Sequence, residues 1–382
     1  MAGTFAHHGG PSRSVPTLCD TLAMHADVAL VTASPTALRE SLRLPSRARS
    51  IVVTEPAPFG RLRGARRFEG AVVSTARETH ASIIHDHGIW LPSNHASARA
   101  AAKLGVPRVV SPRGMLSQWA LDHRGWKKRL AWRLYQRADL ESASAFHATA
   151  EKEAVEIRAL GFTQPIAVIP NGIEIPAAPL SPSPSPARGR GGTKVALFMS
   201  RLHPKKGVLD LILAWGRVRP RNWELWLAGP DEGGYRVTLE KEIARLGLAE
   251  EIRFLGEVGD AEKARLFARA DLFVLPSHDE NFGLVVGEAL AAGVPVVTTT
   301  ATPWTDLERI GAGWIVPPGV DGAIKALRTA CALERDQLAQ MGKRARQWAE
   351  SSLTWPSVAL RMKVFYEWLL DRQQDRPEWV RT

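Results

Sequence analysis

The chain has 382 residues, of which 45% are hydrophobic and 23% are charged, and its formal net charge is +11. This length suits two domains with two buried cores, and the hydrophobic share excludes a wholly disordered protein. No apolar run approaches the roughly 18 residues that cross a bilayer, and we do not expect the opening residues to be a secretory signal. With only two cysteines, we expect no disulfide framework and a reducing, cytoplasmic environment.

Short runs rich in β-branched residues alternate with longer amphipathic stretches, a pattern typical of βαβ units and parallel sheets. Before the middle of the chain, the predicted strands are 27–32, 50–54, 82–86, 107–111, 145–148 and 166–169, and the predicted helices are 13–25, 93–104, 124–142 and 150–160. After it, the predicted strands are 194–200, 223–228, 252–255, 271–276, 294–299 and 314–316, and the predicted helices are 207–217, 236–246, 260–270, 283–292, 321–350 and 356–371. The expected fold class is α/β, with two doubly wound, Rossmann-like domains.

A segment rich in proline, serine and glycine, 176–193, cannot build a core and is predicted to be a linker. It separates a first domain, 1–175, from a second domain, 194–352. Residues 1–175 carry a net charge of +8, so most of the positive charge precedes the linker. That charge could meet a nucleic acid, an anionic membrane or a phosphorylated substrate.

Two glutamates follow the predicted strand at 271–276. Glu280 stands in the loop, Gly283 opens the next helix, and Glu288 lies farther along that helix. Open α/β sheets bind ligands at the carboxyl ends of their strands, and the free N–H groups of a helix's first turn suit a phosphate. About 12 Å apart along a helix, the carboxylates are too distant to share a proton, but each could accept hydrogen bonds from a different sugar. Alternatively, both are solvated surface charges.

A basic block follows the strand at 194–200. Arg201 leaves the end of that strand, and Lys206 precedes Gly207, where the next helix begins. Two cations that converge on one crevice would neutralise a diphosphate, although basic loop residues are often merely solvated. The glycine-rich turn that begins at Gly229 closes another strand and could admit a close backbone approach.

Together these blocks resemble the C-terminal half of the retaining GT-B glycosyltransferases of family 4. Glu280 and Glu288 match the family's E-x7-E pattern, and the block from Arg201 to Gly207 matches its R-x-x-x-x-K-G context. The stretch VIPNGIE, 168–174, is similar to the family's entry into the donor domain. The resemblance covers nearly the whole chain. It implies two Rossmann-like domains that face a central cleft, with a C-terminal helical segment, 353–382, that crosses back to the first domain.

The resemblance also implies roles for these residues. The donor would be a nucleoside-diphosphate sugar, and no metal or other cofactor is expected. Arg201 and Lys206 would stabilise the departing diphosphate, so with Glu280, which would contact the transferred hexose, they are the expected catalytic residues. Glu288 would contact the ribose. The other expected donor-binding residues are Gly10, Asn281, Phe282, Gly283 and Gly229.

The N-terminal half would hold the acceptor. The motifs HGIW and PRGML each follow a predicted strand, which makes His87 and Arg113 the acceptor-side candidates, although His87 could simply pack at a strand end. With GGPSRSV near the start, these motifs resemble a subgroup found in bacterial exopolysaccharide and lipopolysaccharide clusters. Many family members have a histidine near this position, and that histidine contacts the donor sugar. In this chain Arg113 stands there instead, so its role departs from the family's pattern.

Lysine, arginine and aromatic residues gather at 123–140, a composition typical of a helix that lies on an anionic membrane. A solvated helix with its tryptophans in the core is the alternative. Because acceptors in this family are often lipid-linked, we expect peripheral attachment to the inner face of the plasma membrane.

The sequence of residues 1–6, MAGTFA, is poorly suited to a strand. Family members, by contrast, usually begin with an apolar first strand ahead of a glycine loop. In a doubly wound sheet that strand is central, and without it two strand edges would be unpaired. We therefore expect either a start farther upstream or a weakened N-terminal domain.

The expected function is transfer of a hexosyl group, with retention, from a nucleoside-diphosphate sugar to a lipid-linked cell-surface polysaccharide or lipopolysaccharide intermediate. The alternatives are another GT-B enzyme, a phosphorylase or epimerase, and a basic nucleic-acid-binding protein. The short length disfavours a phosphorylase. The carboxylate pair disfavours contact with nucleic-acid phosphates.

Overall fold

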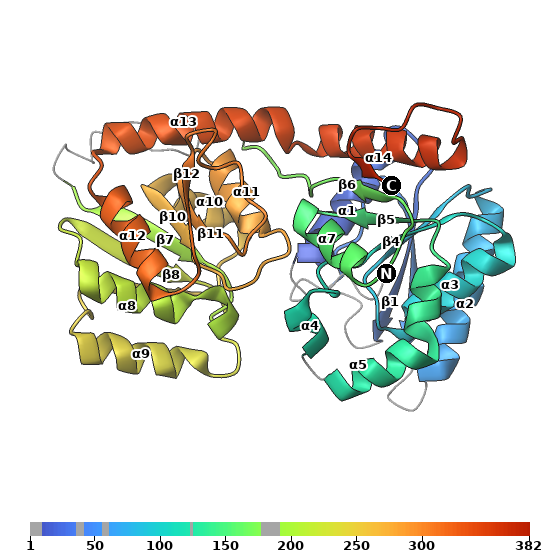
Figure 1. The fold of residues 1–382 in the computed structure, drawn as a ribbon, viewed down its shortest axis with the longest axis horizontal. Coiled ribbons are helices and arrows are strands. Elements are labelled where there is room, and N and C mark those ends of the chain that lie inside the picture. The colour runs from blue at the N-terminus through green and yellow to red at the C-terminus, as the bar shows by residue number, and fades with distance from the viewer. Residues whose placement is uncertain (1–9, 36–41, 56–60, 123–124, 177–191) are drawn as a thin grey trace. The chain divides into compact units, whose positions relative to one another are not determined.

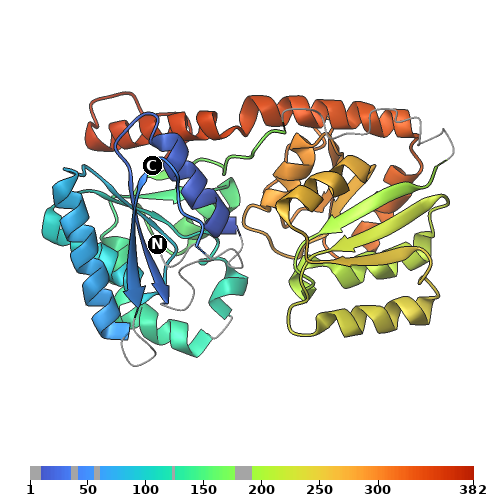
Figure 2. The same cartoon turned by 180° about the vertical axis from the view of Figure 1, so that it is seen from behind.

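The computed structural model describes residues 10–35, 42–55, 61–122, 125–176 and 192–382. The chain forms two compact units, which Figures 1 and 2 show from opposite sides. Residues up to Gly172 and Trp355–Thr382 make the N-terminal unit, and Ile173–Thr354 make the C-terminal unit. The predictions for residues 1–6 and for most of the linker concern residues outside the described set.

The C-terminal unit contains one parallel sheet with the strand order β12-β11-β10-β7-β8-β9. Its strands are β7 (Lys194–Met199), β8 (Trp223–Ala228), β9 (Ile252–Gly256), β10 (Leu272–Leu275), β11 (Val296–Thr299) and β12 (Gly313–Val316). Its helices are the 3-10 turn η5 (Pro204–Lys206), α8 (Val208–Val218), α9 (Tyr235–Leu246), α10 (Asp260–Arg269), α11 (Leu284–Ala291), α12 (Val320–Cys331) and α13 (Arg335–Ser352).

Helices cover both faces of this sheet, so its inner strands β7 and β10 are mostly apolar. α8 packs against α9 and α12, whereas α11 packs against β10 and α13. Side chains of β7 and β10 are therefore buried on both faces, including those of Phe198 and Phe273. Their apolar runs made these strands predictable.

The N-terminal unit contains two separate sheets. Strand order β13-β6-β5-β4-β3 describes the larger sheet, and a parallel pair, β1-β2, forms the smaller one. The strands are β1 (Ala29–Pro35), β2 (Arg49–Glu55), β3 (Ile84–His87), β4 (Arg108–Ser111), β5 (Ala145–Ala148), β6 (Ile166–Val168) and β13 (Val380–Arg381). The helices are α1 (Gly10–Leu22), α2 (Arg61–Glu78), α3 (Pro92–Leu104), α4 (Gln118–Asp122), α5 (Gly125–Ala131), the π-helical turn η4 (Trp132–Gln136), α6 (Arg137–Glu141), α7 (Glu151–Ala159) and α14 (Trp355–Leu370).

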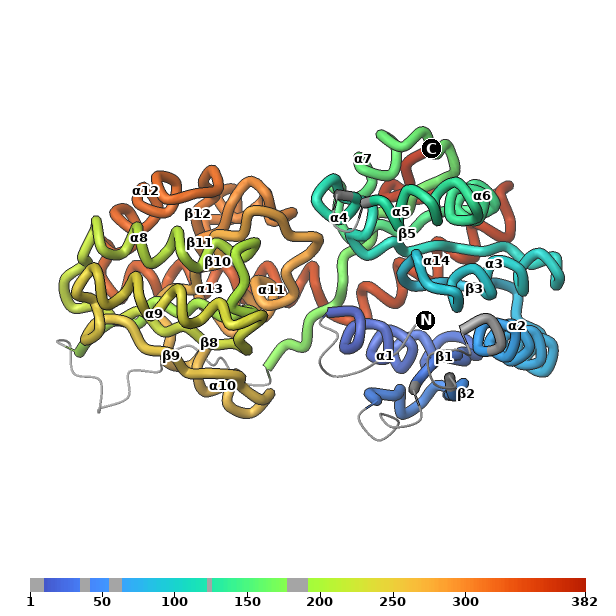
Figure 3. The backbone as a smooth tube through the Cα atoms, turned by 90° about the horizontal axis from the view of Figure 1, so that it is seen from below, coloured from blue at the N-terminus to red at the C-terminus, as the bar shows by residue number. Residues whose placement is uncertain are grey.

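The last long helix, α14, contributes to the core of this unit. It packs against α1, as Figure 3 shows from below. Leu18 and Leu22 of α1 share a buried cluster with Phe365 and Trp368 of α14. None of the described helices is both long enough and apolar enough to cross a bilayer.

The predicted strands are all present, but the sequence analysis missed the short strand β13, and its other errors concern helices. The sequence analysis missed α2, whose two glycines weaken its helical pattern but whose buried face packs against α3. The predicted helix 124–142 is divided by the π-helical turn η4. The predicted helix 321–350 is two helices, because Glu334 caps the start of α13.

The close approach of α13 to the turn after α11 predicts a large effect of one methyl group. A Cβ at Gly342 would lie 1.9 Å from the carbonyl oxygen of Gly293, so Gly342→Ala must separate the two backbones. We expect a loss of about 1–3 kcal/mol in the free energy of unfolding, measured by thermal or urea unfolding. The control is Gly70→Ala in α2, where no atom lies within 4 Å and a gain of about 0.5–1 kcal/mol is expected. Equal stability of the two variants would contradict this packing.

Candidate functional site

The loops that follow β7 and β8 are held together at the carboxyl edge of the C-terminal sheet. The N–H group of Leu202 donates to the carbonyl oxygen of Pro230 at 2.8 Å. Gly229 has φ +138°, and a Cβ there would lie 1.9 Å from the carbonyl oxygen of Ser200. Only glycine allows this approach, so the predicted role of Gly229 in close backbone packing has a structural basis.

The loop after β7 also contacts the loop after β10. Gly207 has φ +68°, and a Cβ there would lie 2.0 Å from the carbonyl oxygen of Pro276. Between the same two loops, the N–H group of His278 donates to the carbonyl oxygen of Lys205 at 2.8 Å. The basic block and the acidic loop, which are distant in sequence, are therefore neighbours in the fold.

Lys206 and Glu280 meet at this contact and form a buried ion pair. The Lys206 ammonium donates to Oε2 of Glu280, and only 11% and 15% of the two side chains are exposed. Within the described residues, Oε1 of Glu280 has no hydrogen-bond partner, so it can accept one from a ligand. The pair lies where the strand order reverses between β7 and β10, and open α/β sheets bind ligands at such reversals.

Arg201 lies at the same edge and is more exposed. Its guanidinium is 2.8 Å from a carboxylate oxygen of Glu232, and about half of each side chain is exposed. An exposed pair of this kind contributes only about 0–1 kcal/mol, so a diphosphate could replace Glu232 at little expense. The sequence analysis did not anticipate Glu232, which belongs to the loop after β8.

The other predicted donor residues occupy different environments. Glu288 of α11 pairs with Lys263 of α10 at 2.6 Å, a partner that the sequence analysis also missed. The ring of Phe282 is buried against Trp304, whose indole N–H donates to the Phe282 carbonyl oxygen at 2.5 Å. Asn281 is half-buried in the loop ahead of α11, and Gly283 directly precedes that helix. Trp304 is itself 5% exposed and belongs to the hydrophobic core of the C-terminal unit.

In the N-terminal unit, Arg113, which follows β4, contacts His87, the last residue of β3. The guanidinium of Arg113 donates to Nδ1 of His87 at 3.1 Å and to Oδ1 of Asn171 at 2.7 Å. Arg113 makes no ion pair with a described carboxylate, and its buried Nε has no hydrogen-bond partner there. Its φ of +58° lies in the left-handed region, which residues other than glycine seldom adopt. Gly10, the remaining candidate, is the half-buried first residue of α1.

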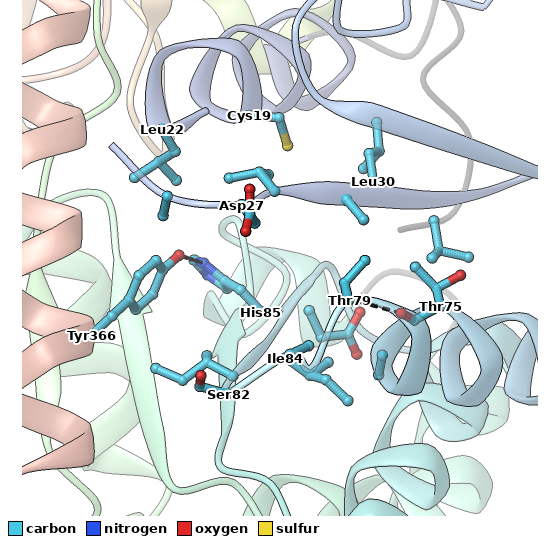
Figure 4. A pocket seen from close by; sticks show the side chains of 18 of the residues that line it. Cys19, Leu22, Asp27, Leu30, Thr75, Thr79, Ser82, Ile84, His85 and Tyr366 are labelled. Atoms are coloured by element: carbon cyan, nitrogen blue, oxygen red, sulfur yellow. Dashed lines mark hydrogen bonds between the residues drawn. The ribbon is translucent and has the colours of Figure 1, made fainter. Parts of the chain in front are cut away.

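Hydrogen bonds fix the tautomers of two histidines near Arg113, His147 and His85. His147 donates from Nε2 to the Ile169 carbonyl oxygen, so its Nδ1 accepts the proton of the Ser111 hydroxyl. Ser111 in turn accepts from Nε2 of His85, and Nδ1 of His85 accepts from Tyr366 at 2.6 Å (Figure 4). Each neutral imidazole therefore has one possible tautomer.

The same reasoning applies to His87. Because Arg113 donates to its Nδ1, the proton of the neutral ring is on Nε2. No described residue accepts a hydrogen bond from that nitrogen. The geometry therefore presents an N–H donor beside an unpaired cation.

Burial keeps these imidazoles neutral. It lowers the pKa of His85 and His87 well below the ordinary histidine value, and the nearby histidines and Arg113 lower it further. Burial and the charge of Arg113 lower the pKa of His147 to about 3, although its hydrogen bond to Ile169 opposes this shift. Burial also lowers the pKa of Arg113 to about 10, although Glu153 favours its charged form, so the guanidinium remains protonated at neutral pH.

Two protein families match this chain, one in each half, and together they cover most of its length. Residues 185–348 match the family described as glycosyl transferases group 1, and residues 9–172 match the glycosyl transferase 4-like domain. Glycogen synthase of Mycobacterium tuberculosis is 30% identical over 299 residues, which cover 75% of this chain and 69% of the relative.

The chain belongs to the group 1 glycosyltransferases. A phosphatidyl-myo-inositol mannosyltransferase of Mycobacterium leprae is 34% identical to this glycosyltransferase over 204 residues, which cover 52% of each chain. The family assignment confirms the glycosyltransferase resemblance drawn from the Glu280 and Arg201 motifs, and retention of configuration stays a prediction.

Solved structures confirm the GT-B fold. Sucrose-phosphate synthase from Thermosynechococcus elongatus aligns with a TM-score of 0.74 at 20% identity, covering 95% of this glycosyltransferase and 94% of that chain. HepE from Anabaena, in complex with UDP and glucose, aligns with a TM-score of 0.70 at 23% identity, covering 94% and 97%. WaaG, which acts in lipopolysaccharide biosynthesis, aligns with a TM-score of 0.69 at 18% identity, covering 95% and 97%.

The buried histidines predict that stability depends on pH. In the unfolded chain, His85, His87 and His147 bind protons below about pH 6.5, whereas in the folded glycosyltransferase they remain neutral. The unfolded state therefore binds more protons, and the free energy of unfolding falls as the pH decreases below 6.5. The expected slope is up to about 1.4 kcal/mol per pH unit for each histidine, measured by urea unfolding between pH 7.5 and 5. The exposed His80 supplies the control, because His80→Asn should leave the slope unchanged. A flat profile would contradict burial of neutral imidazoles.

Proposed function

We propose that this glycosyltransferase transfers a hexosyl group from a nucleoside-diphosphate sugar to a lipid-linked saccharide, with retention of anomeric configuration and without a metal ion. The acceptor would be a growing cell-surface polysaccharide or lipopolysaccharide intermediate at the inner face of the plasma membrane. The observation that carries this proposal is the Lys206–Glu280 pair at the reversal of strand order, with Arg201 at the same edge.

The charges of the C-terminal unit support a diphosphate donor. Arg201 and Lys206 lie at the end of one strand, and both are positioned to neutralise phosphate oxygens. Glu280 retains a free oxygen that can accept a hydrogen bond from a hexose hydroxyl. Glu288, on the helix that begins after Gly283, would accept hydrogen bonds from the ribose and release Lys263. HepE, which shares the fold, was solved with UDP and glucose.

The chemical step follows from these assignments. The acceptor hydroxyl oxygen forms a bond to the anomeric carbon on the face from which the diphosphate departs. The bond between the anomeric carbon and the diphosphate oxygen breaks, and the hydroxyl proton passes to that oxygen. Because attack and departure share one face, configuration is retained without an enzymic nucleophile. Arg201 and Lys206 stabilise the negative charge that develops on the leaving group.

The N-terminal unit supports an acceptor that carries phosphate. Arg113 is a desolvated cation without an ion-pair partner among the described carboxylates, and His87 presents an N–H donor beside it. Such a pair suits an oxyanion, and the first phosphate of a lipid-linked saccharide supplies one. One relative, the mannosyltransferase from Mycobacterium leprae, is named for a phosphorylated lipid.

Exposed apolar side chains on the segment from α4 to η4 support membrane attachment. Trp126, Leu130 and Leu134 recur every four residues and are 65%, 54% and 71% exposed. Trp119 on α4 is 47% exposed. Lysines and arginines occupy the positions between them, at 127–129 and 133. Apolar side chains flanked by cations are typical of surfaces that bind anionic lipid.

A transfer assay with GDP-mannose, GDP-fucose, UDP-glucose and UDP-galactose in EDTA tests the reaction. We expect one donor to be used, and NMR of the product should show the anomeric configuration of that donor. Arg201→Ala should lower kcat/KM by about 100-fold, because leaving-group stabilisation is lost. The control is Arg217→Ala, since Arg217 is a similarly exposed arginine that faces Asp321. An inverted product, or equal activity of the two variants, would contradict the proposal.

Vesicle sedimentation tests the membrane surface. We expect binding to phosphatidylglycerol-containing vesicles and little binding to phosphatidylcholine alone. Combined Trp126→Ser and Leu134→Ser substitutions should weaken binding by tenfold or more, since each buried side chain contributes about 1.5–3 kcal/mol. Leu360→Ser, at a 54% exposed leucine of α14, is the matched control. Unchanged binding of the double variant would exclude this surface.

A further inference from the structure

A buried carboxylate, that of Glu153, lies close to the loop that carries Arg113. Glu153 belongs to the first turn of α7, and only 1% of this residue is exposed. α7 packs against β5 and β6 of the larger sheet of the N-terminal unit (Figure 1). The described partners of the carboxylate are hydrogen-bond donors rather than cations, and a charge that is removed from water needs such donors.

The two oxygens of this carboxylate bind different loops. Oε2 accepts hydrogen bonds from the N–H group of Thr149 at 2.7 Å and from its hydroxyl at 3.0 Å. Oε1 accepts one from the N–H group of Gly114 at 2.6 Å. Thr149 directly follows β5, and Gly114 lies in the loop after β4, which pairs with β5. Glu153 therefore joins the carboxyl ends of two neighbouring strands.

The start of α7 explains only one of these two contacts. A glutamate in the first turn of a helix often accepts a backbone N–H just ahead of that helix, and the bond from Thr149 is of this kind. The bond from Gly114 contributes nothing to the start of α7, because Gly114 belongs to a different loop. Its acceptor carries a negative charge, which makes it about twice as strong as a bond between neutral groups. Oε1 thus acts on the loop after β4.

Gly114 shares a peptide group with Arg113, so this bond orients the backbone that carries the guanidinium. The φ of +58° at Arg113 is unfavourable for a residue with a side chain. A different rotation of the shared peptide group would turn the N–H of Gly114 away from Glu153. In the orientation that Glu153 holds, the guanidinium donates to both His87 and Asn171.

The charge of Glu153 also acts on Arg113, although the two side chains form no described ion pair. Burial lowers the pKa of Arg113 to about 10, and the nearby carboxylate opposes this shift. A directly paired carboxylate would compete with a phosphate for the donors of the guanidinium. A carboxylate that is bound through the backbone instead stabilises the cation and leaves its remaining donors available.

We propose that Glu153 is a positioning residue for the oxyanion site on the acceptor side. It holds the peptide group between Arg113 and Gly114, so that the guanidinium and the N–H group of His87 can bind the same phosphate. Glu153 itself acts only through Arg113. This inference rests on the proposed function, which assigns the phosphate of the acceptor to Arg113 and His87.

Nitrogen-15 NMR of the His87 ring in the ligand-free glycosyltransferase tests the positioning. Because Arg113 donates to Nδ1 of this ring, we expect only the tautomer with its proton on Nε2. Glu153→Gln replaces one carboxylate oxygen by an NH₂ group, which faces N–H donors of the two loops. The peptide group of Arg113 should then rotate, and the ring should become a mixture of both tautomers.

Two variants of the same region supply the controls. Thr149→Val removes one hydrogen bond from the Glu153 carboxylate but leaves the bond from Gly114, so it should lower Tm and keep the single tautomer. Glu151→Gln changes a carboxylate in the same helical turn whose side chain is 59% exposed, and it should alter neither property.

Titration with inorganic phosphate extends the test to binding. The readout is the Nε–H signal of Arg113, which is assigned by its loss in Arg113→Lys. We expect Glu153→Gln to weaken phosphate binding at Arg113 by about tenfold or more, because the donors no longer point to one position. The affinity for the nucleotide sugar should be unchanged, because Arg201 and Lys206 belong to the other unit.

A single tautomer of His87 and unchanged phosphate affinity in Glu153→Gln would overturn the inference, as would an equal effect of Thr149→Val. If Glu153→Gln does not fold, Glu153→Asp takes its place, since the shorter side chain cannot reach both loops, and the same two outcomes decide. A wild-type Arg113 signal that ignores phosphate would reject the proposed acceptor site. The tautomer of His87 would still decide the role of Glu153.

Discussion

A buried lysine requires a carboxylate, and in the C-terminal unit that requirement is met where the order of the sheet reverses. Lys206 follows the first strand of this sheet, and Glu280 follows the fourth, β10. The reversal makes these strands neighbours, so both side chains reach one carboxyl edge. Removing one partner of such a largely buried pair leaves a charge without its partner, which is destabilising. The loops after β7 and β10 are therefore held in a fixed relation, which the approach of Gly207 to Pro276 reinforces.

The cations of the two candidate sites differ in their partners. Arg201, Lys206 and Lys263 each have a carboxylate partner, so phosphate or sugar binding there exchanges one partner for another. Arg113 of the N-terminal unit has no such partner among the described carboxylates, and an oxyanion would supply the first one. Its contact with His87 also fixes the tautomer of that ring. Under the proposed function, the donor side would exchange one partner for another, and the acceptor side would recognise an added negative charge.

Apolar contacts set the limits of each unit. α14 is distant in sequence from α1, yet Phe365 and Trp368 complete the core against Leu18 and Leu22. The N-terminal unit therefore needs the end of the chain for its stability. The exposed Trp126, Leu130 and Leu134 are the opposite case, because the fold leaves them on the surface while it buries other large apolar side chains. An exposed apolar row of this size is typical of a binding surface.

The sequence by itself determined the strands, the α/β class and the family, because buried parallel strands are continuous apolar runs and the Glu280 and Arg201 motifs have fixed spacing. It did not show α2, whose stability comes from packing against α3 rather than from helix propensity. It also could not show that Glu232 and Lys263 pair with Arg201 and Glu288, since these partners come from other loops and helices. The tautomers of the buried histidines were likewise decided by tertiary structure, because burial and hydrogen-bond partners exist only after distant strands have assembled.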